Sequence, residues 1–302
     1  MHSNRGSSVL LFFVDGLGIG QRSEENPLFK IPELAPLAVF QDQTGPEQIE
    51  GTLAVTDACL GIEGRPQSAS GQTTIYTGIN APARLGYHKQ GFPNAELREI
   101  IDSHSIFKQL KNEGIEHSVF ANTYTPKFFE SEPRWKSATT CAVEAAKMRF
   151  CRIPDLLGGR ALYHDFTNRT LIAAGHKVPE FSPVDAAEIL AGLTNEYSFV
   201  LYEHFITDKI GHDMDWDRAE RHLPELSTLI RETISRLDPS RTTFVLTSDH
   251  GNIEDLSIRN HTRNPVPTFI WGRDMENFGK RIKDLTDITP AILDNLTSGQ
   301  QS

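Results

Sequence analysis

Short, continuously apolar runs alternate along the chain with segments that have a helical pattern. The runs are VLLFFV (9–14), HSVFA (117–121), SFVLYEHF (198–205), TFVLTS (243–248) and PTFIWG (267–272). Continuous rather than alternating apolarity indicates strands that are buried on both faces. Helical patterns cover residues 96–114, 183–193 and 219–237. Strands and helices in alternation predict an α/β fold with a mostly parallel sheet covered by helices.

One segment interrupts this alternation. Residues 126–182 contain a pair of glycines, Gly158 and Gly159, but no long buried strand. We interpret the segment as a small cap inserted into a core that consists of residues 1–125 and 183–302. A chain of 302 residues is long enough to bury a sizeable core and to carry such an insertion.

Charge and composition narrow the range of partners. The net charge of -10 argues against binding to nucleic acid, which is itself a polyanion. It does not exclude a small phosphorylated substrate, because a bound dication reverses the local sign of the field. Residues 9–14 are too few to cross a bilayer, and three cysteines without a CxxC spacing fit free thiols in a reducing compartment. We therefore expect a cytoplasmic monomer with no membrane or nucleic-acid partner.

Acidic residues follow three of the predicted strands. Asp15 comes directly after residues 9–14, and Asp249 and His250 come directly after the run TFVLTS. Asp208 lies a few residues past SFVLYEHF. The carboxyl ends of parallel strands meet at one edge of a sheet, where ligands bind. We therefore expect these acids to share one site. Gly251, directly after His250, is predicted to let the chain turn there.

Histidines complete a candidate metal site. Asp208 and His212 are spaced i and i+4, so one helical turn directs both side chains to the same place. His261 lies in the loop before the last predicted strand. Two histidines and one carboxylate suit zinc or manganese and leave positions open for substrate. A second set, made of Asp15, Asp249 and His250, needs one more ligand.

Ser68 can supply that ligand. The stretch RPQSASGQTTIYTG is typical of a loop that enters a helix, with Ser68 at or near the N-cap. A hydroxyl at the positive end of a helix, bound to a dication, ionises near neutral pH and becomes a nucleophile. Two cations about 4 Å apart would hold the attacking and leaving oxygens of a phosphoryl transfer.

These motifs resemble the alkaline-phosphatase superfamily, in particular the metalloenzyme domain of cofactor-independent phosphoglycerate mutase and phosphopentomutase. Four stretches carry the resemblance: VDGLGIG (14–20), PQSASGQTTIYTG (66–78), TDKIGH (207–212), and SDHGNIED with NHTRNPVP (248–255 and 260–267). The resemblance implies a three-layer α/β/α sandwich that binds two divalent metal ions, Mn²⁺ or Zn²⁺. It implies the ligands Asp15, Ser68, Asp249 and His250 for one ion and Asp208, His212 and His261 for the other, with Ser68 as nucleophile.

The chain also departs from the mutases. Their motif around the nucleophile usually reads NSEVGH, whereas this chain reads QSASGQ and has Gln72 in place of the histidine. In place of their ETEKY segment, with its catalytic lysine, it has ANTYTPKFF, and Lys127 is offset by two positions. The segment 126–182 is smaller than their substrate domain. A small cap favours hydrolysis, because a mutase must keep its intermediate dry while the substrate reorients.

The sequence thus predicts a phosphatase that acts on small phosphomonoesters through a phosphoserine. Two alternatives stay open: a phosphomutase, and a non-catalytic metal-binding protein with the same fold. Three basic residues beside the motifs, Arg65, Lys209 and Arg263, are candidates for binding the substrate phosphate, because a cation there suits a phosphate group. Ordinary surface charge is the alternative reading for each of them.

Overall fold

The computed structural model describes residues 6–42, 49–131 and 133–298. Its main sheet has the strand order β2-β8-β7-β1-β6-β3. The strands are β1 (Ser8–Val14), β2 (Thr52–Thr56), β3 (Ser118–Phe120), β6 (Phe199–His204), β7 (Thr242–Thr247) and β8 (Val266–Gly272). The five predicted runs therefore all become strands of one sheet.

The sheet is mostly parallel, as predicted. Strands β3, β6, β1 and β7 run parallel to one another, whereas β8 pairs antiparallel with β7, and β2 pairs antiparallel with β8. The sequence pattern did not predict β2, because its residues TLAVT lie at the sheet edge and are only partly buried. An antiparallel edge on a parallel core is common in folds of this class.

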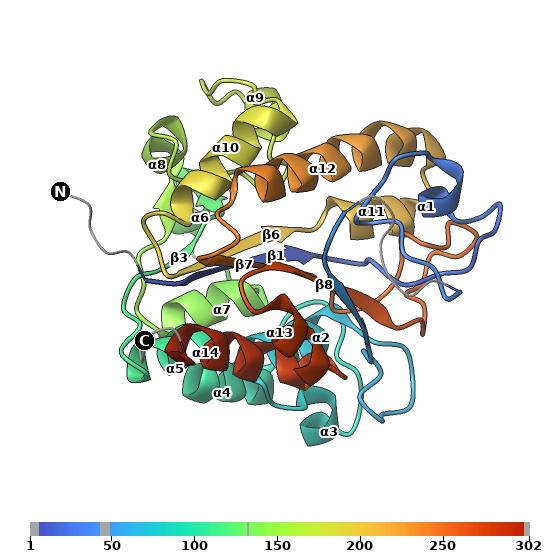
Figure 1. Ribbon diagram of the computed structural model, residues 1–302, viewed down its shortest axis with the longest axis horizontal. Coiled ribbons are helices and arrows are strands. Elements are labelled where there is room, and N and C mark those ends of the chain that lie inside the picture. The colour runs from blue at the N-terminus through green and yellow to red at the C-terminus, as the bar shows by residue number, and fades with distance from the viewer. Residues whose placement is uncertain (1–5, 43–48, 132, 299–302) are drawn as a thin grey trace.

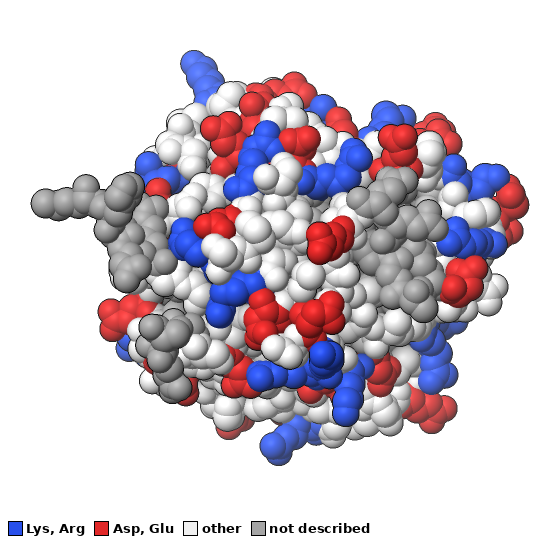
Figure 2. All heavy atoms as spheres, in the orientation of Figure 1, with Lys and Arg blue, Asp and Glu red and all other residues white. Residues whose placement is uncertain are grey.

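Helices cover both faces of the sheet, so the predicted three-layer α/β/α sandwich is confirmed (Figure 1). Leu10, Phe12 and Val14 enter the core on one face, and the alternate residues of β1 enter the core on the other. This explains why the run 9–14 is continuously apolar. On the described part of the face seen in Figure 2, positive and negative side chains are interspersed.

The two helical layers contain the following elements. Above the sheet in Figure 1 lie α1 (Pro27–Lys30), α8 (Ile153–Leu157), α9 (Arg169–Ala173), α10 (Pro183–Leu193), α11 (Ile206–Asp213) and α12 (Trp216–Arg236). Below it lie α2 (Ser68–Thr77), α3 (Ala81–Leu85), α4 (Ala95–His104), α5 (Ile106–Asn112), α7 (Ala138–Ala145), α13 (Met275–Arg281) and α14 (Ile288–Ser298), the last preceded by the short 3₁₀ helix η1 (Leu285–Asp287). No helix in the described ranges is both long and apolar enough to cross a membrane.

The predicted helices follow local signals closely. Helix α10 has the predicted bounds because Pro183 occupies its first turn and Ser182 forms a capping box with Asp185. The predicted helix 96–114 is divided in two at Ser105, whose backbone is not helical. The Ser105 hydroxyl donates to the carbonyl of Ala142, and this tertiary contact fixes the break.

The predicted cap, residues 126–182, is partly built into the sandwich. It contains α6 (Pro126–Ser131), and its helix α7 packs against α2 and α4 below the sheet, with Ala142 and Val143 in the core. Its short strand β5 (Cys151–Arg152) pairs with β4 (Thr123–Tyr124), which belongs to the predicted core. A separate cap with the bounds 126–182 stays a prediction.

Candidate metal centre

Three strands bring the predicted acids to one edge of the sheet. Asp15 follows β1, Asp249 follows β7, and Asp208 lies in α11, which begins two residues after β6 ends. The backbone N–H of Asp15 donates to the carbonyl of His204, and the Thr207 hydroxyl donates to the carbonyl of Asp15 at 2.6 Å. These contacts hold the start of α11 beside the end of β1.

The first group of side chains is Asp208, His212 and His261. His212 Nε2 lies 3.3 Å from Asp208 Oδ2 and 3.1 Å from His261 Nε2. His261 Nε2 lies 3.5 Å from Asp208 Oδ1. As predicted, Asp208 and His212 reach the same place from one turn of helix. All three donor atoms lie within 4.8 Å of one another, close enough to surround one metal ion.

The second group is Asp15, Asp249, His250 and Ser68. His250 Nε2 lies 3.3 Å from Asp15 Oδ1, 3.5 Å from Asp249 Oδ2 and 3.0 Å from Ser68 Oγ. Ser68 is the first residue of α2, one position after the N-cap Gln67. Donor atoms of Asp15, His250 and Asp208 also lie within 4.8 Å of one another, so the two groups are adjacent.

Backbone carbonyls fix the orientation of two of the imidazoles. His261 Nδ1 lies 2.9 Å from the carbonyl of Pro66, and His212 Nδ1 lies 2.6 Å from the carbonyl of Arg259. Because a carbonyl only accepts hydrogen bonds, Nδ1 must carry the proton in each ring. Nε2 then faces the other ligands, and in the neutral ring it presents a lone pair, as histidines bound to metals usually do.

Burial and repulsion shift the pKa values of the second group. Burial, followed by the charges of Asp249 and Asp208, raises the pKa of Asp15 well above its usual range. Burial and the charge of Asp208 likewise raise the pKa of Asp249. Burial lowers the pKa of His250 to about 3, so this imidazole is neutral at pH 7. The carboxyl groups of this set therefore resist ionisation together unless positive charge is supplied nearby.

In the first group, hydrogen bonds between the side chains determine the pKa shifts and favour the charged forms. The hydrogen bond from His212 to Asp208 raises the pKa of His212 to about 9. Burial tends to raise the pKa of Asp208, but the hydrogen bonds with His212 and His261 outweigh it and hold this pKa well below the usual range. Without a cation, this group is therefore an internal ion pair.

The buried carboxylate of Glu254 joins the loops that carry the ligands. It accepts hydrogen bonds from the backbone N–H groups of Gly18 and Asn252, from the Thr262 hydroxyl at 2.5 Å and from the Asn264 amide. The loops after β1 and β7 and the loop before β8 thus meet at one side chain. This contact makes the position of each loop depend on the others.

The role predicted for Gly251 was wrong in its physical reason. Its backbone is not in the left-handed region, unlike that of Gly16, which has a φ of 74°. A Cβ at residue 251 would instead overlap the side chains of Glu254 and Thr262. The chain does bend at Asp249 and His250, after β7 has ended, but glycine is needed at residue 251 because the loop packs closely against Glu254.

The geometry agrees with comparisons of sequence and structure. The profile of the metalloenzyme superfamily matches residues 7–299. The chain belongs to the metalloenzyme superfamily. The predicted resemblance is therefore confirmed at the level of the family.

This metalloenzyme is 23% identical over 271 residues to a phosphopentomutase of Alkaliphilus metalliredigens (strain QYMF), an alignment that covers 85% of this chain and 67% of that one. It is 25% identical over 124 residues to a 2,3-bisphosphoglycerate-independent phosphoglycerate mutase of Desulforudis audaxviator (strain MP104C), which covers 39% of this chain and 24% of the mutase. Its fold is similar to that of a cold-active alkaline phosphatase from Shewanella sp., with a TM-score of 0.54, 13% identity, and coverage of 96% and 99% of the two chains.

The three basic residues predicted to bind phosphate differ in their surroundings. Arg65 and Arg263 are exposed and adjoin Pro66 and Thr262, beside the first group of ligands. Lys209 is adjacent to Asp208, and its ammonium nitrogen lies 4.6 Å from the centroid of the Phe205 ring. Their role in substrate binding stays a prediction.

Sequence reasoning missed two polar side chains of the metalloenzyme site. Gln72 Nε2 lies 3.2 Å from both Asp15 Oδ2 and Asp249 Oδ2 and donates to both carboxylates. The Asn252 amide donates to Asp208 Oδ1 at 2.7 Å. The signal for Gln72 was its position, four residues after Ser68 on one face of a helix. The glutamine that replaces the histidine of the mutase motif is therefore part of the site.

Proposed function

We propose that this chain transfers the phosphoryl group of a small phosphomonoester through a covalent phosphoserine at Ser68, and that water accepts it. The net reaction is then hydrolysis. The observation that carries the proposal is the place of the Ser68 hydroxyl. It lies at the start of a helix, where negative charge is stabilised, and 3.0 Å from His250 within a cluster of three aspartates and three histidines.

The donor set fits two divalent cations. Partly buried carboxylates and imidazoles together suit Mn²⁺ or Zn²⁺ better than a purely oxygen-liganded ion. Asp208, His212 and His261 would hold one cation, and the second group would hold the other. The raised pKa values of Asp15 and Asp249 support this, because a cation offsets the repulsion that raises them. Bound cations would supply positive charge that stabilises ionised Ser68 and the phosphoryl oxygens.

The chain's own residues perform a double displacement. Ser68 Oγ loses its proton to solvent and attacks phosphorus opposite the leaving oxygen, so an Oγ–P bond forms as the ester O–P bond breaks, and the departing alkoxide takes a proton from solvent. Water then attacks the same phosphorus, breaks the Oγ–P bond, and releases inorganic phosphate and the free hydroxyl of Ser68. Gln72 holds the carboxylates of Asp15 and Asp249 in place during both steps.

A phosphomutase is the second candidate, and the phosphopentomutase relative favours it. In a mutase, a second hydroxyl of the same substrate accepts the phosphoryl group, so water must be kept away while the substrate turns. Here α7 packs into the lower helical layer, which leaves less of the segment 126–182 to close over the site. This packing supports hydrolysis.

The test is to load the protein with Mn²⁺ or Zn²⁺, supply a panel of phosphomonoesters, and measure both inorganic phosphate and isomeric esters by phosphorus NMR. We expect Ser68→Ala to lower kcat on the order of a thousandfold or more while the bound metal stays. The control is Ser235→Ala, because the Ser235 hydroxyl donates to Glu232 on the surface of α12.

Three outcomes would contradict parts of the proposal. Turnover that survives Ser68→Ala would exclude Ser68 as nucleophile. An isomeric ester formed without phosphate release would identify a mutase. Tight metal binding without turnover of any ester would favour a non-catalytic metal-binding protein.

A further inference from the structure

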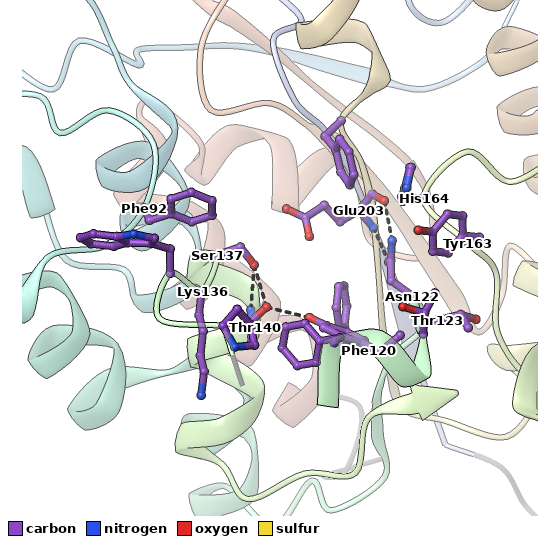
Figure 3. A pocket seen from close by; sticks show the side chains of 16 residues that line it. Phe92, Phe120, Asn122, Thr123, Lys136, Ser137, Thr140, Tyr163, His164 and Glu203 are labelled. Carbon is purple, nitrogen blue, oxygen red and sulfur yellow. Dashed lines mark hydrogen bonds between the residues drawn. The ribbon is translucent and has the colours of Figure 1, made fainter. Parts of the chain in front are cut away.

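A cavity of about 360 Å³ opens at the same edge of the sheet, beside the candidate metal centre. Figure 3 shows its lining, which comes from the ends of β3 and β6 and from the segment around α6 and α7. Aromatic rings form much of its walls: Phe92, Phe120, Tyr124, Phe128, Trp135, Tyr163 and Phe205. The volume lies within the range of cavities that hold small organic ligands.

Short stretches of chain and the hydrogen bonds between two loops place this cavity next to Ser68 and the candidate metal ligands. Phe205 lines the cavity and lies three residues before Asp208, and Lys209 covers its ring. On the other side, Phe92 belongs to the loop after α3. The backbone of Lys89 in that loop exchanges hydrogen bonds with Ser70, two residues after Ser68 in α2. A molecule with its phosphate at Ser68 can therefore extend into the cavity.

One acidic side chain reaches into this aromatic space. Glu203 pairs with Phe13 in the sheet, and Figure 3 shows its carboxyl group extending between Ser137 and Asn122. The Asn122 side chain forms two hydrogen bonds with the backbone of Glu203. Its amide nitrogen donates to the Glu203 carbonyl, and its amide oxygen accepts from the Glu203 N–H. These bonds hold the backbone of Glu203 at the end of β6, and its carboxyl group, which has the Thr139 side chain as a hydrogen-bond partner, lines the cavity.

Several other polar groups of the lining already have partners within the protein, whereas Thr123 Oγ1 and His164 Nδ1 have no hydrogen-bond partner among the described residues. The Tyr124 hydroxyl lies 2.8 Å from that of Thr140, which lies 2.9 Å from that of Ser137. Lys136 forms an ion pair with Glu144. Burial lowers the pKa of His164 to about 4, so it is neutral at pH 7. Glu203 is thus the group best placed to accept a hydrogen bond from a ligand.

We propose that this cavity binds the leaving group of the phosphate ester, and that the leaving group is a planar ring with an N–H or O–H donor that faces Glu203. Aromatic walls stack on flat rings, and a rigid carboxyl group at the end of an apolar space selects a ligand that brings its own donor. The inference rests on the proposed function. A nucleobase joined through a sugar and a simple hydroxyaryl group both share this chemistry, and the experiment below distinguishes them.

The first experiment compares kcat/KM for matched esters: a purine nucleoside 5′-monophosphate, ribose 5-phosphate, hydroxyphenyl phosphate and phenyl phosphate. We expect each ester with a donor-bearing ring to react on the order of tenfold faster than its partner without the ring or the donor. A preference for the nucleotide over hydroxyphenyl phosphate identifies a nucleobase, and the reverse identifies a simple aryl group.

Two variants separate stacking from hydrogen bonding. Trp135→Ala removes a ring that is 55% exposed, so the fold is retained, and should raise KM about tenfold for all ring esters but not for ribose 5-phosphate. Glu203→Gln should lower kcat/KM for hydroxyphenyl phosphate and leave kcat/KM for phenyl phosphate unchanged. The matched control is Leu157→Ala, which truncates an equally exposed apolar side chain in α8, outside the cavity lining.

Direct binding separates failure of this inference from failure of the proposed function. Calorimetry with the nucleoside and with the phenol, added to the Ser68→Ala protein, should show binding that Trp135→Ala weakens about tenfold, whether or not any ester is turned over. If ester turnover is found but is equal across the series and insensitive to both variants, the assignment of this cavity is overturned. If ring binding is found without turnover, the cavity is supported and the proposed reaction is not.

Discussion

The two groups of candidate ligands lie against each other but balance their charges in opposite ways. Asp208, His212 and His261 form an internal ion pair, and the His212 side chain is 39% exposed. Asp249 and His250 are fully buried, and the carboxylates of their group repel one another. The first group is therefore preformed without a cation, whereas the second is strained until positive charge arrives. Two groups built from the same residue types thus differ in whether they need the positive charge of a metal ion to offset their own charges.

The largest expected effect is on metal-dependent stability. Saturation with Mn²⁺ or Zn²⁺ at about a thousand times the dissociation constant should stabilise the protein by about 4 kcal/mol per site. Such a gain raises the melting temperature by roughly 10 °C. Thermal unfolding with elemental analysis checks this. If the second group did not bind a cation, Asp249→Asn would bind as much metal as the unaltered protein.

The next prediction concerns the free energy of unfolding, which should change in opposite directions when an aspartate is replaced in each of the two groups. In metal-free protein near pH 8, Asp249→Asn should raise the free energy of unfolding by about 1 to 3 kcal/mol, because the folded protein must either bury the charge of Asp249 or bind a proton that the unfolded chain releases. Asp208→Asn should lower it by a similar amount, because it leaves His212 and His261 without their partner. Urea unfolding in the presence of a chelator measures both values. Equal signs for the two variants would refute the contrast between the groups.

A smaller effect tests whether burial alone raises a carboxyl pKa at this edge. Burial raises the pKa of Glu203 to about 7, and the hydrogen bond with Thr139 opposes this only in part. Because the folded pKa lies above the unfolded one, the stability that neutral Glu203 contributes is complete below about pH 4.5. It is lost as the pH rises to about 7 and stays constant above that. The loss is at most about 3 kcal/mol.

Glu203→Gln should remove this pH dependence. Its free energy of unfolding should approach or exceed that of the unaltered protein as the pH rises from 5 to 8. Urea unfolding over this range, with a chelator present, is the measurement. A constant difference between the two proteins at every pH would show that Glu203 does not titrate in this window.

The sequence predicted the parts of the site that depend on local order along the chain. Asp15, Asp208 and Asp249 follow strands whose apolarity was plain, and the parallel arrangement brought them together. The contacts of Gln72 could not be predicted, because its partners lie 57 and 177 residues away. Strand β2 was missed because an edge strand needs little apolarity. Glu203 was hidden inside an apolar run, where only the neighbouring elements reveal that its carboxyl group faces a cavity.

The central position of β1 has a consequence for folding. Val9 pairs with Phe199 on one side and with Thr243 on the other, so both partners of β1 lie roughly two hundred residues or more further along the chain. Pairing between such distant segments slows folding, because a long loop must close before any contact forms. A nascent chain therefore carries Asp15 and Ser68 without their partners until β7 has left the ribosome. The candidate metal centre can form only after the chain has been synthesised past His261.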